Sequence, residues 1–143
     1  MSERQIVPVF FACDEDFVKF MMVTIQSVME NASLGNDYRF YVLNTGISDS
    51  RKQDVYRLVA SKPDFSVEFV DVTPYLEELK QKLPLRDYYS MTTYYRLFIP
   101  DLYPEYQKVV YLDSDVVVLG DIAEFYAYDL TGAYVGAVPD QLV

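Results

Sequence analysis

The chain has 143 residues, of which 51% are hydrophobic and 24% are charged, so it can bury the core of one globular domain and is not disordered. Its formal net charge is −10 and no run of Lys and Arg forms a basic stripe, which argues against nucleic acid and anionic membranes as partners. Histidine is absent, which excludes a Cys–His catalytic pair, and the lone Cys13 cannot form an internal disulfide.

The first half of the chain alternates between strand-like and helix-like segments. Short apolar or alternating runs are each followed by a segment whose apolar positions repeat at helical spacing. We expect Asp16 to be the N-cap of the first helix and Ser48 to be the N-cap of the second. The predicted strands cover residues 6–13, 38–44 and 66–72, and the predicted helices cover residues 16–32, 48–61 and 74–83.

The second half contains an acidic break inside an apolar run. Residues 90–104 predict a short helix that ends at Pro100. The run "KVVYLDSDVVVL" (108–119) predicts a strand, an acidic turn and a second strand, and Asp121 is placed to cap a following helix. Residues 132–143 predict one more strand.

This alternation predicts an α/β fold with a mainly parallel sheet flanked by helices. No linker or internal repeat divides the sequence, so we expect residues 1–143 to belong to one domain. In such sheets ligands bind outside the carboxyl ends of the strands, where polar groups fall at residues 13–16, 44–46 and 113–115. We expect these groups to converge on one site, with the acidic pair at the end of a central strand.

The acidic pair is Asp113 and Asp115. Residues i and i+2 of an extended chain lie on the same side about 7 Å apart, so a slight turn lets both carboxylates face one cation. Carboxylate oxygens suit hard ions such as Mg²⁺ or Mn²⁺. The alternative is an Asx-type turn, in which both aspartates accept hydrogen bonds from backbone N–H groups.

A phosphatase is another alternative for the same residues. "DSDVVVL" fits the Asp-x-Asp pattern of haloacid-dehalogenase-like phosphatases, in which the first Asp is the nucleophile, the second is a general acid and Mg²⁺ is bound. That motif normally follows the first strand of the domain and is followed by a Lys. The residues after Asp115 contain no Lys, which makes this interpretation the weaker one.

Longer stretches follow one another along nearly the whole chain in an order that is typical of one family. They are "VFFACDEDF", "YVLNTGIS", "SMTTYYRLFIPDLYPEYQKVVYLDSDVVVLGDIAEFY" and "DLTGAYVGAVPD". The combination of Thr-Thr-Tyr-x-Arg-Leu with Tyr-Leu-Asp-x-Asp at this spacing is specific. Together these stretches resemble glycosyltransferase family 8, which contains bacterial lipopolysaccharide galactosyltransferases and glucosyltransferases and the glycogenins.

The resemblance implies a GT-A type, Rossmann-like fold, a UDP-sugar donor, and retaining transfer of glucose or galactose to a saccharide acceptor. It places Mn²⁺, or Mg²⁺, on Asp113 and Asp115, where the ion would bridge the donor's diphosphate. Arg96 would be the catalytic group that reaches the donor sugar or its phosphate, and Asp140 would lie on the acceptor side. The residues implied to bind the nucleotide sugar are Ala12, Asp14, Asp16, Arg96, Asp113, Ser114 and Asp115.

Two of these assignments have plainer alternatives. Asp14 and Asp16 could serve only as caps of the helix that follows them. Arg96 could be the partner in a surface ion pair. The ligand-binding roles require that these side chains face a shared cavity, whereas the capping and ion-pair alternatives do not.

The resemblance also implies an incomplete domain, because the later His that usually completes the family's metal site is missing. We therefore expect residues 1–143 to be a donor-binding amino-terminal part that is inactive alone. Its open sheet edge would favour a homo-oligomer. The alternative is a non-catalytic module that binds nucleotide sugars. No signal peptide and no apolar run of about 18 residues is present, so we expect a cytoplasmic protein without a transmembrane segment.

Overall fold

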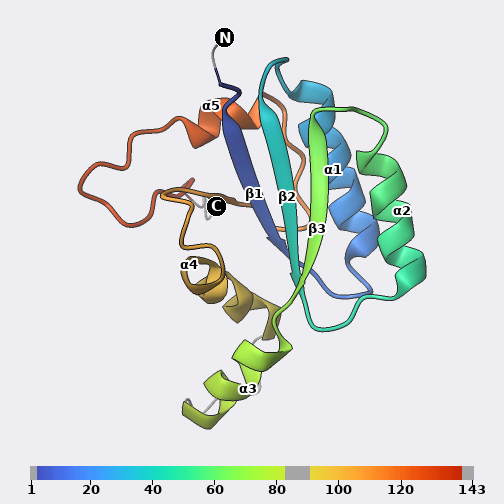
Figure 1. The fold of residues 1–143 in the computed structure, drawn as a ribbon, viewed down its shortest axis with the longest axis vertical. Helices are drawn as coiled ribbons and strands as arrows, with labels where there is room; N and C mark the ends of the chain where they lie inside the picture. Colours follow the sequence, from blue (N-terminus) through green and yellow to red (C-terminus); the bar gives the residue numbers. More distant parts are fainter. Residues whose placement is uncertain (1–2, 83–90, 140–143) are drawn as a thin grey trace.

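A parallel sheet is the centre of the fold in the computed structural model, which describes residues 3–82 and 91–139. In these residues the sheet has four strands in the order β3-β2-β1-β4, and every neighbouring pair is parallel (Figure 1). The strands are β1 (Ile6–Ala12), β2 (Asp37–Asn44), β3 (Phe65–Asp71) and β4 (Val110–Tyr111). The predicted α/β class and parallel sheet are confirmed.

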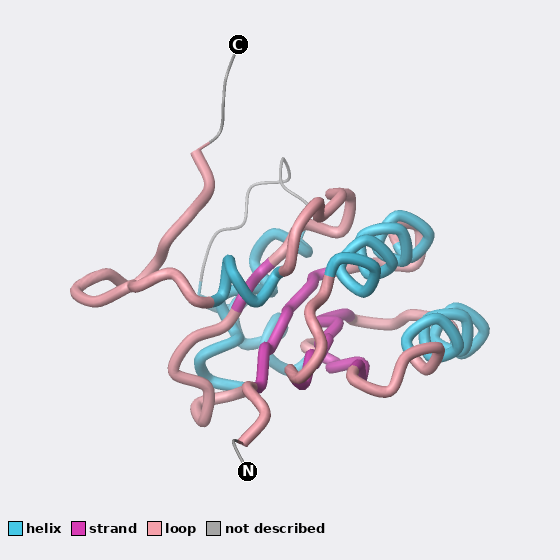
Figure 2. The backbone as a smooth tube through the Cα atoms, turned by 90° about the horizontal axis from the view of Figure 1, so that it is seen from above, coloured by secondary structure: helices cyan, strands magenta, loops and turns pink. Residues whose placement is uncertain are grey.

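Helices cover both sides of the sheet (Figure 2). α1 and α2 lie side by side on one face, and a 3₁₀ helix, η1, leads into α4 on the other (Figure 1). In the described residues no helix has the length and apolar character needed to cross a bilayer. The helices are α1 (Val18–Asn31), α2 (Asp49–Val59), α3 (Thr73–Lys82), η1 (Met91–Phe98), α4 (Ile99–Leu102) and α5 (Ile122–Tyr126).

Strand β1 is the most deeply buried element because it has helices on both faces. Val9 and Phe11 pack toward α1 and α2, whereas Phe10 and Ala12 pack toward η1 and α4. Each fully buried side chain of this size contributes about 1.5–3 kcal/mol relative to an exposed one. Burial on both faces explains why the sequence of this strand is continuously apolar rather than alternating.

The helix boundaries confirm one predicted cap and correct two other predictions. Ser48 caps α2, where its hydroxyl accepts a hydrogen bond from the Arg51 N–H. Asp16 is not the N-cap of α1, because Phe17 occupies that position and makes no side-chain capping bond. Pro100 does not end a helix but lies in the first turn of α4, where its missing N–H costs no hydrogen bond.

The predicted strand after the acidic break is wrong. Residues 116–119 have no strand partner in the structure, although their sequence is apolar. Side chains of α1 bind this segment instead: the Thr24 hydroxyl donates to the Val116 carbonyl (2.6 Å), and the Ser27 hydroxyl accepts from the Val118 N–H (2.9 Å). These bonds satisfy the backbone groups that a neighbouring strand would otherwise bind.

The last predicted strand is also absent from the part of it that the structure describes. Residues 132–139 form no strand and are exposed, and residues 140–143 lie outside the described residues. The expected helix after the acidic break is present as α5, and Asp121 caps it by accepting a bond from the Ala123 N–H (3.0 Å). The caps at Ser48 and Asp121 are therefore correctly predicted, whereas the cap at Asp16 and these two strands are not.

Asp121 also joins two distant parts of the fold. It accepts hydrogen bonds from the hydroxyl of buried Tyr38 (2.8 Å) and from the Ser33 N–H (3.2 Å), besides its bond to Ala123. Partial burial opposes the charge of Asp121, but the bonds from Ser33, Ala123 and Tyr38 outweigh this effect and lower its pKa. The ionised carboxylate therefore stabilises the folded state.

Replacing Asp121 by Asn should lower the free energy of unfolding at pH 7 by about 1 kcal/mol, because charge-assisted hydrogen bonds become neutral ones. The pKa of Asp121 is lower in the folded chain, so its contribution is complete above the unfolded pKa of about 3.9 and is lost as pH falls through the folded value. Urea unfolding at pH 7 and pH 2 should show the difference between the wild type and Asp121→Asn shrinking at the lower pH. Asp16→Asn, at an exposed aspartate, is the control, and an equal loss in both variants would contradict the prediction.

Candidate functional site

The carboxyl ends of β1 and β4 meet beside η1 around a cavity of about 290 Å³. Two of the three polar groups that the sequence places at strand ends, residues 13–16 and 113–115, contribute to its lining. The predicted convergence at the carboxyl edge is therefore correct for these two groups. The cavity is lined by Ala12, Cys13, Asp14, Phe17, Thr92, Thr93, Arg96, Tyr111, Asp113, Ser114 and Asp115.

Two of the predicted site residues are not brought to this cavity by the described structure. Asp16 is exposed beside Phe17 and does not line the cavity, and Asp140 lies outside the described residues. Their predicted contacts remain predictions. The position of the acidic pair also needs one correction: β4, the strand that precedes it, is at the edge of the described sheet and not at its centre.

The third polar group, residues 44–46, serves the fold. The amide of Asn44 is buried and donates to the carbonyls of Val42 (3.0 Å) and Val70 (3.3 Å), while its oxygen accepts from the Gly46 N–H (3.1 Å). Its polar atoms are thus engaged by backbone groups, which leaves Asn44 no free donor for a ligand. The position of Asn44 at a strand end, which is all that the sequence shows, does not distinguish a structural role from a ligand-binding role.

Asp113 and Asp115 are exposed, and within the described part of the chain neither carboxylate makes a hydrogen bond or an ion pair. The alternative of an Asx-type turn requires such bonds to backbone N–H groups, so the described residues do not support it. Two unpaired carboxylates beside a cavity repel each other unless a cation is present. Carboxylate oxygens are ligands that suit hard divalent ions.

Ser114, between the two aspartates, contributes to the cavity lining but is itself buried. Its hydroxyl donates to the carbonyl oxygen of Ala12 at 2.7 Å, across 102 positions of sequence. Both residues were predicted to bind the nucleotide. The structure shows that they also join the acidic turn to the end of β1, which the sequence motif did not reveal.

Arg96 lies in the last turn of η1 at the same cavity. Its guanidinium carbon is 4.5 Å from the centre of the Tyr111 ring, and its Nε donates to the Thr93 carbonyl (3.1 Å). The alternative of a surface ion pair is not seen, because no carboxylate of the described residues pairs with Arg96. Burial raises the pKa of Tyr111, and the charge and hydrogen bond of Arg96 oppose this rise only in part.

The loop after β1 is held by two acidic residues. One oxygen of Asp14 accepts the Phe17 N–H (3.1 Å) in the turn before α1, which itself has no side-chain capping bond, and Asp14 also lines the cavity. Glu15, which sequence reasoning missed, accepts from both the N–H (2.9 Å) and the hydroxyl (2.7 Å) of Ser48. Hydrogen bonds from Ser48 lower the pKa of Glu15. The loop is thereby fixed to the start of α2.

Cys13 lines the cavity but is unsuited to metal binding or nucleophilic attack. Burial raises the pKa of its thiol to about 12, and its Sγ donates to the Asp14 carbonyl (3.2 Å). Thiolates, not thiols, bind metals and attack electrophiles. Residues 3–82 and 91–139 contain no group of three or more His, Cys, Asp or Glu side chains placed to hold a metal.

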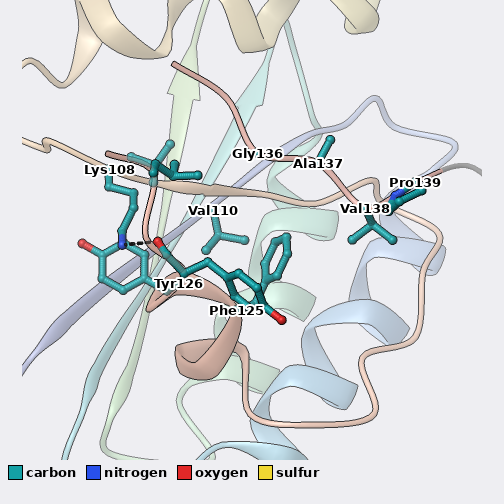
Figure 3. A pocket seen from close by; sticks show the side chains of 11 residues that line it. Lys108, Val110, Phe125, Tyr126, Gly136, Ala137, Val138 and Pro139 are labelled. Atoms are coloured by element: carbon teal, nitrogen blue, oxygen red, sulfur yellow. Dashed lines mark hydrogen bonds between the residues drawn. The ribbon is translucent and has the colours of Figure 1, made fainter. Parts of the chain in front are cut away.

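A larger cavity of about 420 Å³ lies between β4, α5 and the segment that follows α5 (Figure 3). Its one cation, Lys108, donates to the Tyr128 carbonyl (3.1 Å) and lies 4.8 Å from the centre of the Tyr126 ring. The other lining residues are apolar, aromatic or glycine, so this cavity offers no carboxylate or free cation for chemistry. We therefore assign the candidate site to the smaller, polar cavity.

Residues 8–143 match glycosyl transferase family 8. The chain belongs to this family. GlyB of Streptococcus pneumoniae is 31% identical over 143 residues, which are 98% of this chain and 32% of GlyB. GlyF of the same organism is 27% identical over 132 residues, which are 92% of this chain and 31% of GlyF. General stress protein A of Bacillus subtilis is 26% identical and is matched over 48% of its length. The chain thus spans about a third to a half of these curated relatives.

Solved structures of glycosyltransferases share the fold. The apo structure of the bifunctional glycosyltransferase WbbM is 31% identical with a TM-score of 0.75, covering 88% of this chain and 21% of WbbM. The galactosyltransferase LgtC, in complex with donor and acceptor sugar analogues, is 26% identical with a TM-score of 0.63, covering 87% of this chain and 43% of LgtC. The predicted GT-A type, Rossmann-like fold is confirmed, and family membership supports glycosyl transfer as the general function.

Replacing Ser114 by Ala should lower the free energy of unfolding by about 1 kcal/mol, because a buried hydrogen bond is lost. It should also speed amide hydrogen exchange at residues 113–115, since the turn loses its attachment to Ala12. Urea unfolding and exchange read by mass spectrometry measure the two effects. Ser50→Ala, at an exposed position in α2, is the control. Unchanged exchange at the acidic turn would show that β4 pairing alone holds it.

Proposed function

We propose that this chain is the donor-binding part of a retaining hexosyltransferase. In this proposal a UDP-sugar binds at the polar cavity with Mn²⁺, or Mg²⁺, on Asp113 and Asp115, and glucose or galactose passes to a saccharide acceptor. The observation that carries the proposal is the placement of two unpaired carboxylates and one unpaired arginine on a single cavity at the carboxyl ends of parallel strands.

The charges around the cavity favour a cation together with an anionic donor. Asp14, Asp113 and Asp115 bring three carboxylates and Arg96 brings one guanidinium, so the site repels a diphosphate when nothing else is bound. A divalent cation on the aspartates reverses this balance. The acidic composition of the whole chain acts in the same direction, because it disfavours binding of an anion without a metal.

Each lining residue has a role that its contacts allow. The guanidinium of Arg96 has N–H groups left to donate to a phosphate oxygen or a sugar hydroxyl after its bond to Thr93. The second oxygen of Asp14 is available to accept from a ribose hydroxyl. When bound, a divalent cation would offset the negative charge that develops on the diphosphate as the bond to the sugar breaks. Arg96 would strengthen that effect at the leaving group.

Of the two alternatives from the sequence, the phosphatase is less well supported and the binding module is distinguished only by a transfer assay. A haloacid-dehalogenase-like phosphatase needs its acidic motif after the first strand of the sheet, whereas Asp113 follows β4. A non-catalytic binding module would use the same donor contacts and differs only in the absence of transfer.

We place the protein in the cytoplasm as part of the proposal, because its only cysteine is buried and unpaired, as is usual in reducing compartments.

UDP binding should depend on Mn²⁺ and should fall at least about tenfold in Asp115→Asn, because a direct metal ligand is lost. Isothermal titration calorimetry with UDP, with and without MnCl₂, measures this. Glu124→Gln removes the same charge from an exposed position on α5 and should bind UDP as the wild type does. Equal affinity with and without Mn²⁺ would contradict the proposed metal site.

Transfer is tested separately from binding. The chain should be incubated with Mn²⁺, a simple saccharide acceptor and either UDP-glucose or UDP-galactose, and the products should be read by mass spectrometry. We expect UDP binding without transfer by these 143 residues alone. An acceptor that gains one hexose would instead show that the described site is sufficient for catalysis, and the anomeric configuration of the product would test retention.

A further inference from the structure

Arg96 has a long, flexible side chain on an exposed turn, yet two contacts fix its position. Its Nε donates to the Thr93 carbonyl at 3.1 Å, and its guanidinium carbon lies 4.5 Å from the centre of the Tyr111 ring. Arg96 also has a side-chain hydrogen bond with the Tyr111 hydroxyl, which opposes the rise that burial causes in the pKa of Tyr111. The group is therefore held in place while most of its donors stay free.

Tyr111 is well suited to support the Arg96 side chain because pairing within the sheet fixes the backbone of Tyr111. It is the last residue of β4 and pairs with Phe10 of β1, and the next residue along, Leu112, donates its N–H to the Phe10 carbonyl (3.0 Å). Its half-buried ring packs against the core cluster on the η1 face of the sheet. Tyr111 thus gives the long Arg96 side chain a fixed support.

Asp113 and Asp115 offer the Arg96 guanidinium an alternative to its contact with the Tyr111 ring. Asp113 and Asp115 line the same cavity, and an arginine released from the ring could form an ion pair with either of them. That ion pair would occupy a metal-binding carboxylate and a phosphate-binding guanidinium at once. An exposed ion pair gains little, whereas stacking on a half-buried ring gains at least as much, so the ring is able to hold the arginine against this competition.

We propose that Tyr111 is a positioning residue of the donor site, whose ring keeps the Arg96 guanidinium stacked at the cavity and away from the acidic pair. The proposal rests on the proposed function for its consequence, because an unpaired Arg96 matters only if the site binds a diphosphate. The stacking itself belongs to the free protein and can be tested without a donor.

The test in the free protein measures the order of the Arg96 side chain. The ¹⁵Nε–¹H signal of Arg96, assigned by its loss in Arg96→Lys, should show a high heteronuclear NOE in the wild type and in Tyr111→Phe. It should fall to the value of a mobile arginine in Tyr111→Leu. An unchanged NOE in Tyr111→Leu would overturn the proposal. Tyr111→Met, which also lacks a ring, replaces Tyr111→Leu if thermal melting shows that the latter is unfolded.

The test with ligand uses calorimetry with UDP in the presence of Mn²⁺. Tyr111→Leu should weaken binding by about three- to tenfold, and Tyr111→Phe should bind nearly as the wild type does. In an Arg96→Ala background the same Tyr111→Leu change should have no further effect, because the ring then has no guanidinium to hold. Equal losses in both backgrounds would overturn the proposal by showing that Tyr111 acts on the donor or on folding directly.

The two tests separate this inference from the proposed function. If the wild type does not bind UDP with Mn²⁺ but the NOE of Arg96 falls in Tyr111→Leu, the proposed function is wrong and the positioning role stands. If the wild type binds UDP and the NOE does not change, the positioning role is wrong and the proposed function stands.

Discussion

The hydrogen bond from the Ser114 hydroxyl to the Ala12 carbonyl is the contact on which the candidate site depends. The paired residues of β4 end at Tyr111, so the strand pairing does not extend to Asp113 and the acidic turn. The buried serine fixes that turn to the end of β1, which is the most deeply buried strand. Because the loop with Asp14 leaves β1 at the same point, one bond sets the position of both acidic groups relative to each other.

Helix α1 extends this control to both sides of the acidic turn. At its start it receives the loop that carries Asp14, and along its length Thr24 and Ser27 bind the backbone of residues 116–118. These hydroxyls replace the neighbouring strand that the apolar sequence predicts. The acidic pair therefore lies between two anchored segments, although neither of its own carboxylates is used to anchor it.

The sequence predicts the regular parts of the fold and the charged parts of the site for different reasons. Periodicity and capping patterns identify the first three strands, α1, α2 and the cap at Asp121, because these depend on neighbouring residues. The state of residues 116–119 depends on hydroxyls about 90 positions away, which no local pattern contains. Likewise the motif identifies Arg96, Asp113 and Asp115, whereas the support of Arg96 by Tyr111 requires the packing of η1 against β4.

In the proposed donor site, the charges of the cavity would make cation binding and diphosphate binding mutually dependent. A cation on Asp113 and Asp115 would remove the repulsion that a diphosphate meets, and a bound diphosphate would add oxygen ligands for the cation. Binding free energies are reciprocal, so each ligand must strengthen the other by the same factor. This coupling requires that no cationic side chain of the protein already forms an ion pair with the two aspartates. Arg96 is the one guanidinium at the described cavity, and its stacking on Tyr111 leaves both carboxylates open.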